Sequence, residues 1–440
     1  MKILMVNKFL HPNGGSETYI FELGKQLTDM GHEVQYFGME HKGRIVGNRV
    51  DSYTADMDFH TGKLQKLFYP FKIIYSVEAR KKIRAVLQDF QPDVVHLNNI
   101  NFQLTPAIIY EIRAFEKMQA RQNAQSSNRR AIKIIYTAHD YQWVCPNHMM
   151  MIPSNEKLCF ACKGGKFGAC TKNRCIHDSL IKSILGSIEA FYYKWRKTYA
   201  LVDVIICPSE FMKKQLDTNP ILAEKTVVMH NFITEMSRDE KLRLNDKTET
   251  VGETEADSEA AESWTRLNAK LPDKYALYFG RFSTEKGVET LLNACRKTSQ
   301  INYVFAGTGP LEKELAKLPN VTNVGFVRGI ALQKLIAQSQ FSLYPSQWYE
   351  NCPFSVMESQ IYGTPVIAAN IGGIPELIED GVTGELFKPG DQSQLEEKII
   401  RLWNQPKLCS KYSENCKNIK FDTTEEYCGK IISDIYRKQV

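Results

Sequence analysis

The feature that most constrains the fold is an alternation of short apolar runs with segments of helical period. Residues 2–7 (KILMVN) are followed by a Gly-Gly loop and the helix-period segment ETYIFELGKQL. EVQYFG, DVVHLN, IKIIYTAH and DVIICPSE are further apolar runs, with helical stretches between them, and MHNFI near Met229 is the expected last strand of this half. Strands that alternate with helices in this way predict a parallel, doubly wound sheet.

The alternation stops in an acidic segment and then begins again. Residues 236–262 carry nine acidic and four basic residues and little that could be buried, which is typical of a flexible connector. Residues 275–280 (YALYFG) resume the pattern, and NYVFAG, VTNVGFV, FSLYPS and PVIAA supply four more expected strands. Because parallel sheets bind ligands at strand carboxyl ends, we expect both halves to turn such loops toward a shared cleft.

Length and composition support two soluble domains. A chain of 440 residues is too long for one ordinary core. With 43% hydrophobic and 24% charged residues, it contains no apolar run of the ~20 residues that span a bilayer. The opening MKILMVNKFL is too short for a signal peptide, and the eleven cysteines then read as thiols or metal ligands. These features predict a cytoplasmic protein.

The net charge is +6, and the charged residues are unevenly distributed along the chain. Residues 63–84 hold seven Lys or Arg and one Glu, interleaved with Leu, Phe, Tyr and Ile. Such a segment suits an amphipathic surface on anionic lipid, which would make the protein peripheral on the inner face of a membrane. The alternative is a solvated helix face over a local core.

Glycines and cations mark two anion-binding candidates. Gly14 and Gly15 open the first expected helix, where free N–H groups and the helix dipole favour an anion. The pattern is not GxGxxG, so a dinucleotide site is disfavoured, and a plain tight turn is the alternative. In GRFSTEKG (280–287), Arg281 and Lys286 follow an expected strand. The guanidinium of Arg281 can bind a diphosphate with two parallel hydrogen bonds, and the ammonium of Lys286 can add a compact positive charge. The alternative there is a pair of ordinary surface cations.

The stretch YENCPFSVMES (349–359) places two glutamates eight residues apart. Glu350 falls in the expected loop after FSLYPS, and Pro353 is expected at the first helical position. Glu358 then lies in the first turns, placed to accept two ribose hydroxyls, while Glu350 can reach a sugar. The backbone N–H groups of Phe354 and Ser355 are expected to hold a phosphate, and Asn351 is a further donor-binding candidate.

A cysteine-rich loop occupies residues 145–175. Cys159, Cys162, Cys170 and Cys175 lie within seventeen positions, enough to close a tetrahedral structural zinc site. Reduced thiols and disulfides are the alternatives. Four Lys or Arg nearby are too few to indicate a nucleic-acid surface, so no nucleic-acid partner is expected.

The string ENCPFSVMESQIYGTPVIAANIGGIPELIEDGVTGELF resembles the signature of the retaining family-four glycosyltransferases, which have the two-domain GT-B fold. The E-x7-E spacing of Glu350 and Glu358, the loop with Arg281 and Lys286, the Gly14–Gly15 loop and the pair His139–Asp140 all match. The resemblance covers the chain except the acidic connector and the cysteine-rich loop. Pro353 departs from it, standing where many members have glycine.

The resemblance implies an organisation and a set of roles. It implies an acceptor-side domain (1–235), a connector (236–270), a donor-binding domain (271–420) and a last helix (421–440) that crosses back to the first domain. Arg281 and Lys286 would neutralise a UDP- or GDP-linked sugar donor, Glu358 would hold the ribose, and Val327 would hold the base by its backbone. Glu350 would contact the sugar, and His139 would lie beside the reacting centre.

The implied reaction is transfer to a hydroxyl of a saccharide or polyprenyl-linked acceptor in surface polysaccharide or glycolipid synthesis. Fixed positive charge would aid departure of the nucleoside diphosphate, so no catalytic metal or other cofactor is expected. Glu350 could act as a nucleophile or only position hydroxyls. The rival interpretations are a two-carboxylate glycosidase, a GT-B phosphorylase and a non-catalytic, zinc-stapled binding protein.

Overall fold

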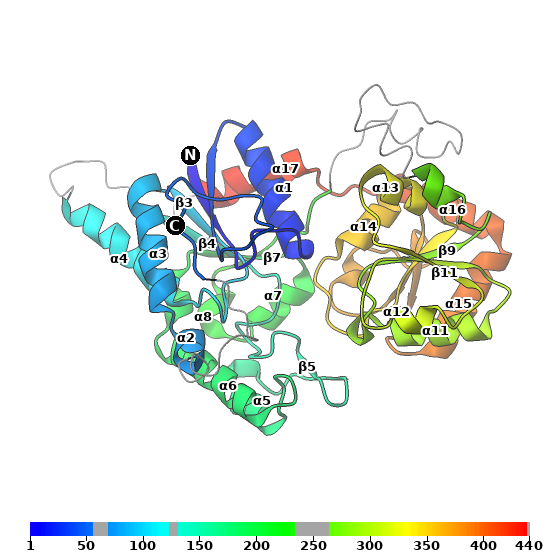
Figure 1. Ribbon diagram of the computed structural model, residues 1–440, viewed down its shortest axis with the longest axis horizontal. Helices are drawn as coiled ribbons and strands as arrows, with labels where there is room; N and C mark the ends of the chain where they lie inside the picture. The colour runs from blue at the N-terminus through cyan, green and yellow to red at the C-terminus, as the bar shows by residue number, and fades with distance from the viewer. Residues whose placement is uncertain (56–68, 123–130, 234–263, 438–440) are drawn as a thin grey trace. The chain divides into compact units, whose positions relative to one another are not determined.

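The computed structural model describes residues 1–55, 69–122, 131–233 and 264–437. The chain divides into two compact units, one formed by Met1–Asn231 with Thr424–Val440 and the other by Phe232–Thr423 (Figure 1). Most of the acidic connector lies outside the described residues. The core of the second unit begins earlier than the expected residue 271, because Trp264 is already buried in it.

The N-terminal unit is built on a parallel sheet of six strands in the order β2-β1-β3-β4-β7-β8. Its strands are nearly continuous apolar runs, as expected for a sheet covered on both faces. Their bounds are β1 Lys2–Val6, β2 Glu33–Phe37, β3 Val94–Leu97, β4 Lys133–Thr137, β7 Val204–Cys207 and β8 Thr226–Val228. The last strand therefore ends before Met229, a few residues earlier than MHNFI predicts.

Helices of the same unit connect these strands. They are α1 Gly15–Asp29, α2 Tyr69–Ile74, α3 Val77–Phe90, α4 Ala107–Gln122, α5 Gly168–Lys172, α6 Leu180–Trp195, α7 Glu210–Leu216 and α8 Pro220–Ala223, with the short 3₁₀ helices η2 Lys163–Gly165 and η3 Thr198–Leu201. The cysteine-rich loop contains a small hairpin, β5 Met151–Ile152 with β6 Lys157–Leu158, which the sequence pattern did not indicate.

The end of the chain packs on the N-terminal unit. Helix α17 Thr424–Lys430 continues into a π-helix, η6 Ile431–Tyr436, and α17 lies against α1 (Figure 1). The hydroxyls of Tyr19 and Tyr427 are 2.8 Å apart, and His96 Nδ1 lies 2.7 Å from the Tyr436 hydroxyl. Buried polar contacts of this kind fix the register of the segment against the sheet.

The C-terminal unit repeats the architecture with a parallel sheet in the order β11-β10-β9-β12-β13-β14. Its strands are β9 Ala276–Phe279, β10 Tyr303–Ala306, β11 Val321–Gly325, β12 Phe341–Tyr344, β13 Val366–Ala369 and β14 Gly384–Phe387, the last one not foreseen. Its helices are α11 Val288–Lys297, α12 Glu312–Leu315, α13 Gly329–Ala337, α14 Phe354–Ile361, α15 Gln392–Asn404 and α16 Pro406–Cys416, with the 3₁₀ helices η4 Thr284–Lys286 and η5 Ile374–Glu376.

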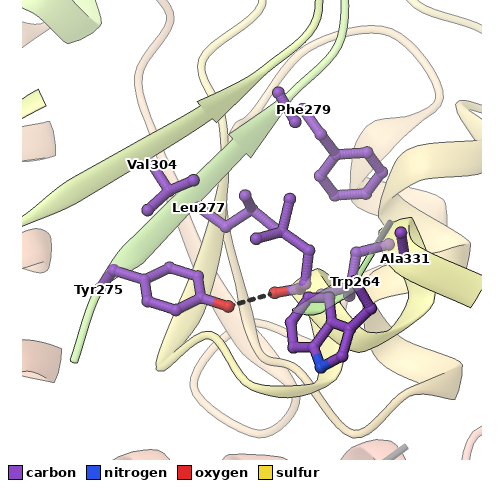
Figure 2. Packing of buried hydrophobic residues seen from close by; sticks show 9 residues of the cluster. Trp264, Tyr275, Leu277, Phe279, Val304 and Ala331 are labelled. Carbon is purple, nitrogen blue, oxygen red and sulfur yellow. Dashed lines mark hydrogen bonds between the residues drawn. The ribbon is translucent and has the colours of Figure 1, made fainter. Parts of the chain in front are cut away.

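One face of the second sheet is closed by an aromatic and aliphatic cluster. Trp264 packs with Leu277, Val304 and Ala331, and the Tyr275 hydroxyl donates to the carbonyl of Leu335 at 2.8 Å (Figure 2). The carbonyl satisfies the one polar atom that the buried tyrosine brings into the core. The cluster thereby fixes β9, the strand from which the candidate binding loop departs.

Candidate functional site

The strand order of the C-terminal unit reverses beside β9. The chain runs from β9 to β10 and β11 on one side, and then returns to place β12 on the other side of β9. The loops after β9 and β12 therefore leave adjacent strands in opposite directions, which is where doubly wound sheets bind ligands. Gly287 permits the close approach of these loops: its φ is +71°, and a Cβ there would lie 1.8 Å from the Pro345 carbonyl oxygen.

Lys286 and Glu350 meet at this strand switch. Lys286 Nζ lies 2.6 Å from Glu350 Oε1, and the same oxygen accepts hydrogen bonds from Ser346 Oγ at 2.9 Å and Trp348 Nε1 at 2.5 Å. The Glu350 side chain is buried, so its charge depends on these donors. From the sequence, Lys286 is expected to bind a phosphate and Glu350 a sugar. In the structure the two side chains form an ion pair with each other. Ser346 is a contact that the sequence pattern did not single out.

Arg281 is the contrasting cation of the same loop. Its side chain is exposed, and within the described residues its guanidinium has no ion-pair or hydrogen-bond partner. Its backbone is anchored, because the Tyr278 hydroxyl donates to the Arg281 carbonyl at 2.7 Å. A fixed backbone with an uncommitted guanidinium is suited to binding an anionic ligand.

Helix α14 begins one residue later than expected. Pro353 is the N-cap, with φ −68° and ψ 123°, rather than the first helical residue. The amides of Val356 and Met357 both reach the Pro353 carbonyl, whereas those of Phe354 and Ser355 have no acceptor in the part of the chain that is described. These two N–H groups at the positive end of a helix remain available to an anion. Asn351 is half-buried in the loop before them.

Glu358 lies in the middle of α14 and is half-buried. Burial raises its pKa from the usual 4.5 to about 7. The carboxyl group is therefore divided between its neutral and charged forms near neutral pH, unlike an ordinary surface glutamate.

Two further loops, which the motifs did not single out, lie at this edge of the sheet. Gly309 follows β10, and a Cβ there would lie 2.4 Å from the Phe282 carbonyl. Gly372 and Gly373 follow β13, and the Gly373 amide donates to the Glu350 carbonyl at 2.8 Å. The tripeptide patterns GTG and IGG after apolar runs were the available signal. Val327, after β11, packs partly against the core cluster of Figure 2.

The N-terminal unit has its own strand switch, between β1 and β3. Gly14 is the N-cap of α1 in an extended conformation, and Gly15 begins the helix. Behind them, the buried Glu17 accepts hydrogen bonds at one oxygen from Asn7 Nδ2 at 2.8 Å and Ser16 Oγ at 2.9 Å. Asn99, after β3, donates to Ser16 Oγ at 2.9 Å. This network, which was not predicted, ties the glycine loop to the neighbouring strand.

His139 follows β4 at the same edge of this sheet. Its Nε2 lies 2.8 Å from Asn98 Oδ1, and burial lowers its pKa to about 3. The imidazole is therefore neutral at physiological pH and can donate or accept a hydrogen bond without carrying charge. Its ring also contacts the Tyr19 ring edge-on, with centroids 5.0 Å apart.

The cysteine-rich loop forms a cavity in the N-terminal unit. The four expected cysteines, Cys159, Cys162, Cys170 and Cys175, line it together with Cys145, which had not been included in the set. All are free thiols. Across the described residues, no three His, Cys, Asp or Glu side chains are arranged so that they could hold a metal ion.

Part of the basic apolar segment 63–84 lies outside the described residues. Within its described part, Arg80 and Arg84 form ion pairs with Glu111 at 2.6 Å and 2.5 Å, and Ile83 is fully buried. Two cations of this part of α3 are therefore engaged by Glu111 within the same unit. A search of the helices in the described ranges finds none that is long and apolar enough to cross a bilayer.

Comparisons with known proteins identify the family of the chain. The model of Glycosyltransferase Family 4 matches residues 13–235, about half of the chain. The chain belongs to this family. A second model, Glycosyl transferases group 1, matches residues 261–419, so the two models together match parts of both units.

Individual relatives are more distant. The chain is 31% identical over 173 residues to alpha-D-kanosaminyltransferase of Streptomyces kanamyceticus, covering 37% of this chain and 45% of that protein. It is 24% identical to an uncharacterised glycosyltransferase of Methanocaldococcus jannaschii, covering 63% and 74%. Among the curated relatives, the match to the kanosaminyltransferase thus spans less than half of that protein's length.

Solved structures show the same fold along the whole chain. Sucrose-phosphate synthase of Thermosynechococcus elongatus superposes with a TM-score of 0.64 at 18% identity, covering 99% of this chain and 98% of that one. HepE of Anabaena, solved with UDP, gives 0.61 at 17% identity and covers 99% and 100%. The two Rossmann-like units therefore form a GT-B fold, as the sequence predicted.

Proposed function

We propose that the chain is a retaining glycosyltransferase that moves a sugar from a UDP- or GDP-linked donor to a hydroxyl of a saccharide or polyprenyl-linked acceptor. The observation that carries the proposal is the Lys286–Glu350 ion pair at the strand switch, on the same loop as the uncommitted Arg281. Membership of the family and the UDP bound by HepE, a protein of the same fold, support a nucleotide-sugar donor.

In this proposal the donor diphosphate is neutralised by Arg281, Lys286 and the amides at the start of α14. An ammonium group has three donors, so Lys286 can keep its hydrogen bond to Glu350 and still contact a phosphate oxygen. Glu350 then has two tasks: it orients Lys286, and it contacts the sugar as a positioning group. Glu358 accepts the ribose hydroxyls, and the backbone at Val327 contacts the base.

The reaction breaks the bond between the sugar C1 and the diphosphate oxygen and forms a bond from C1 to the acceptor oxygen. The acceptor proton passes to the departing diphosphate, so no separate acid is required. The fixed cations stabilise the charge that builds up on the leaving group. Neutral His139 supplies a hydrogen-bonding group beside the reacting centre, and the Gly14–Gly15 loop contacts the donor. No catalytic metal is needed in this scheme, since the protein's own cations occupy that role.

We further propose a cytoplasmic location, which suits the eleven free thiols, and a role in surface polysaccharide or glycolipid assembly, which rests on the family resemblance. Structural zinc on the cysteine-rich loop is a separate proposal. Five thiols on one cavity suit the chemistry of Zn²⁺. Because no three of them are arranged to hold a metal, the thiols would have to rotate toward one another on binding.

Turnover with defined donors tests the proposed function. The protein is incubated with UDP- and GDP-sugars and a panel of saccharide and polyprenyl-linked acceptors, and nucleoside diphosphate release is measured. The anomeric proton of the product is then assigned by NMR. Release that depends on acceptor, with the donor's anomeric configuration kept, supports the proposal. Inverted product contradicts retention, and sugar release that requires inorganic phosphate indicates a phosphorylase.

A further inference from the structure

Helix α6 presents an apolar face to solvent. Of its sixteen residues, the exposed large apolar side chains are Leu180, Ile181, Ile184, Ile188, Phe191 and Trp195. Ile181 is 71% exposed and Trp195 is 76% exposed, at opposite ends of the helix. From Ile181 to Trp195 the spacing alternates between three and four residues, so these side chains follow one another along a single face. Soluble surfaces rarely leave such a stripe uncovered.

The orientation of α6 is fixed by its opposite face. Ser183, Gly186, Ser187, Glu189 and Tyr193 are buried against the rest of the unit. A Cβ at Gly186 would lie 2.4 Å from Ile176 Cδ1, so the helix packs closely against this side chain. The apolar stripe therefore cannot turn inward without breaking this packing.

The neighbouring loop extends the same surface. Phe160 is 40% exposed, and Lys163 Nζ lies 4.3 Å from the centre of its ring. Lys194, on α6, donates to the carbonyls of Gly164 and Gly165 at 3.1 and 3.3 Å, which joins the loop to the helix. Eight of the sixteen exposed large apolar side chains in the described residues fall between positions 158 and 195.

The charge around this face is mainly positive. Residues 145–197 contain nine Lys or Arg and three Asp or Glu, a balance of +6. Lys182, Lys194, Arg196 and Lys197 are exposed on or beside α6. The acidic residue within α6, Glu189, is only 1% exposed, and Asp178 is exposed just before the helix. An apolar stripe with a cationic rim complements an anionic surface, whereas a second copy of the same face would bring like charges together.

We propose that the α6 face, defined as the six exposed apolar side chains of α6 with Phe160 and the cations Lys182 and Lys197, docks the protein on an anionic lipid bilayer. The helix lies in the plane of the interface, with its apolar side chains among the acyl chains and its lysines at the headgroups. This site is distinct from the segment 63–84, and it does not depend on the reaction that the protein catalyses.

Vesicle flotation tests the proposal. Full-length protein is mixed with vesicles of phosphatidylcholine containing phosphatidylglycerol, or of phosphatidylcholine alone, and the bound fraction is measured against lipid concentration and salt. We expect binding to the anionic vesicles that falls as salt rises. The double variant Ile181→Ser/Trp195→Ser should weaken partitioning about tenfold or more, because two deeply inserted apolar groups are removed. Lys182→Gln/Lys197→Gln should weaken binding roughly fivefold per charge.

A matched control distinguishes docking through the α6 face from nonspecific hydrophobic binding and from misfolding. Ile45→Ser removes another exposed apolar side chain of the N-terminal unit, 59% exposed, and should leave binding unchanged. Circular dichroism melting checks that each variant folds. The proposal fails if the wild type ignores anionic vesicles or if the α6 variants bind them like the wild type. It also fails if the wild type is a dimer that the α6 variants convert to a monomer without a change in lipid binding.

Discussion

Lys286 Nζ and Glu350 Oε1 lie 2.6 Å apart across the two loops that leave β9 and β12. The pair places a buried carboxylate and a half-buried ammonium where the strand order reverses. Each charge depends on the other, since removing one partner of a buried pair leaves the second uncompensated. The Lys286–Glu350 ion pair therefore connects the two loops and also forms part of the proposed donor site.

Lys286→Ala should lower donor use and stability together. A charge-assisted phosphate contact is worth ~1.5–3 kcal/mol, so we expect kcat/KM for the donor to fall by roughly one to two orders of magnitude. The melting temperature should also fall, because Glu350 loses its cation. Lys297→Ala, at an exposed position of α11, is the control and should change neither. Unaltered kinetics in the Lys286 variant would remove this residue from the donor site.

Glu358 should make nucleotide binding depend on pH. Burial raises its pKa to about 7, and only the charged form accepts two ribose hydroxyls without having to donate a proton. Affinity for the nucleoside diphosphate should therefore rise as pH increases from about 6 to 8. In Glu358→Gln the remaining pH dependence should be that of the ligand phosphate alone. Calorimetric titration at several pH values measures both proteins, and identical profiles would contradict the assigned role.

Glu189, on the buried face of α6, should make stability depend on pH in a predictable direction. Burial raises its pKa to about 8, so the folded state favours the neutral acid. Stability from this group is complete below its unfolded pKa of about 4.5 and is lost as pH rises through 8. Glu189→Gln keeps a neutral side chain that can accept from Asn101, so its melting temperature should fall less between pH 6 and 9. An equal fall in both proteins would argue against the buried acid.

The cysteine cavity makes a prediction about metal content. If zinc is bound there, protein purified without chelators should contain about one zinc per chain by elemental analysis. Cys162→Ser should then reduce the zinc content and the thermal stability of the N-terminal unit. Cys409→Ser, at a buried thiol of the C-terminal unit, should retain the metal. Metal-free wild-type protein with five titratable thiols in this loop would rule out the zinc site.

Local sequence patterns predicted much of the fold. Apolar runs located the strands, because strands buried on both faces of a parallel sheet are mostly apolar, and the glycines and cations after them located the loops. β14 was missed because GELF alternates only briefly. The onset of the second core was misplaced because Trp264 stands directly after a run of acidic residues.

The contacts at the candidate site were less predictable. Sequence identified Lys286 and Glu350 separately, but their pairing depends on β12 lying next to β9, which no local pattern specifies. The same holds for Cys145, which approaches the other cysteines only through tertiary folding, and for Ser346. The exposed face of α6 was also missed, because an apolar helix face in sequence normally indicates a buried one.

The central claim is that the loop after β9 binds a nucleoside diphosphate through Arg281 and Lys286. The most direct measurement is calorimetric titration of the wild type and of Arg281→Ala with UDP, GDP and their sugars. We predict saturable binding of at least one of these bases to the wild type and a clear loss of affinity in the variant, with its melting temperature unchanged. Absence of binding for every diphosphate, or equal affinity in both proteins, would contradict the account.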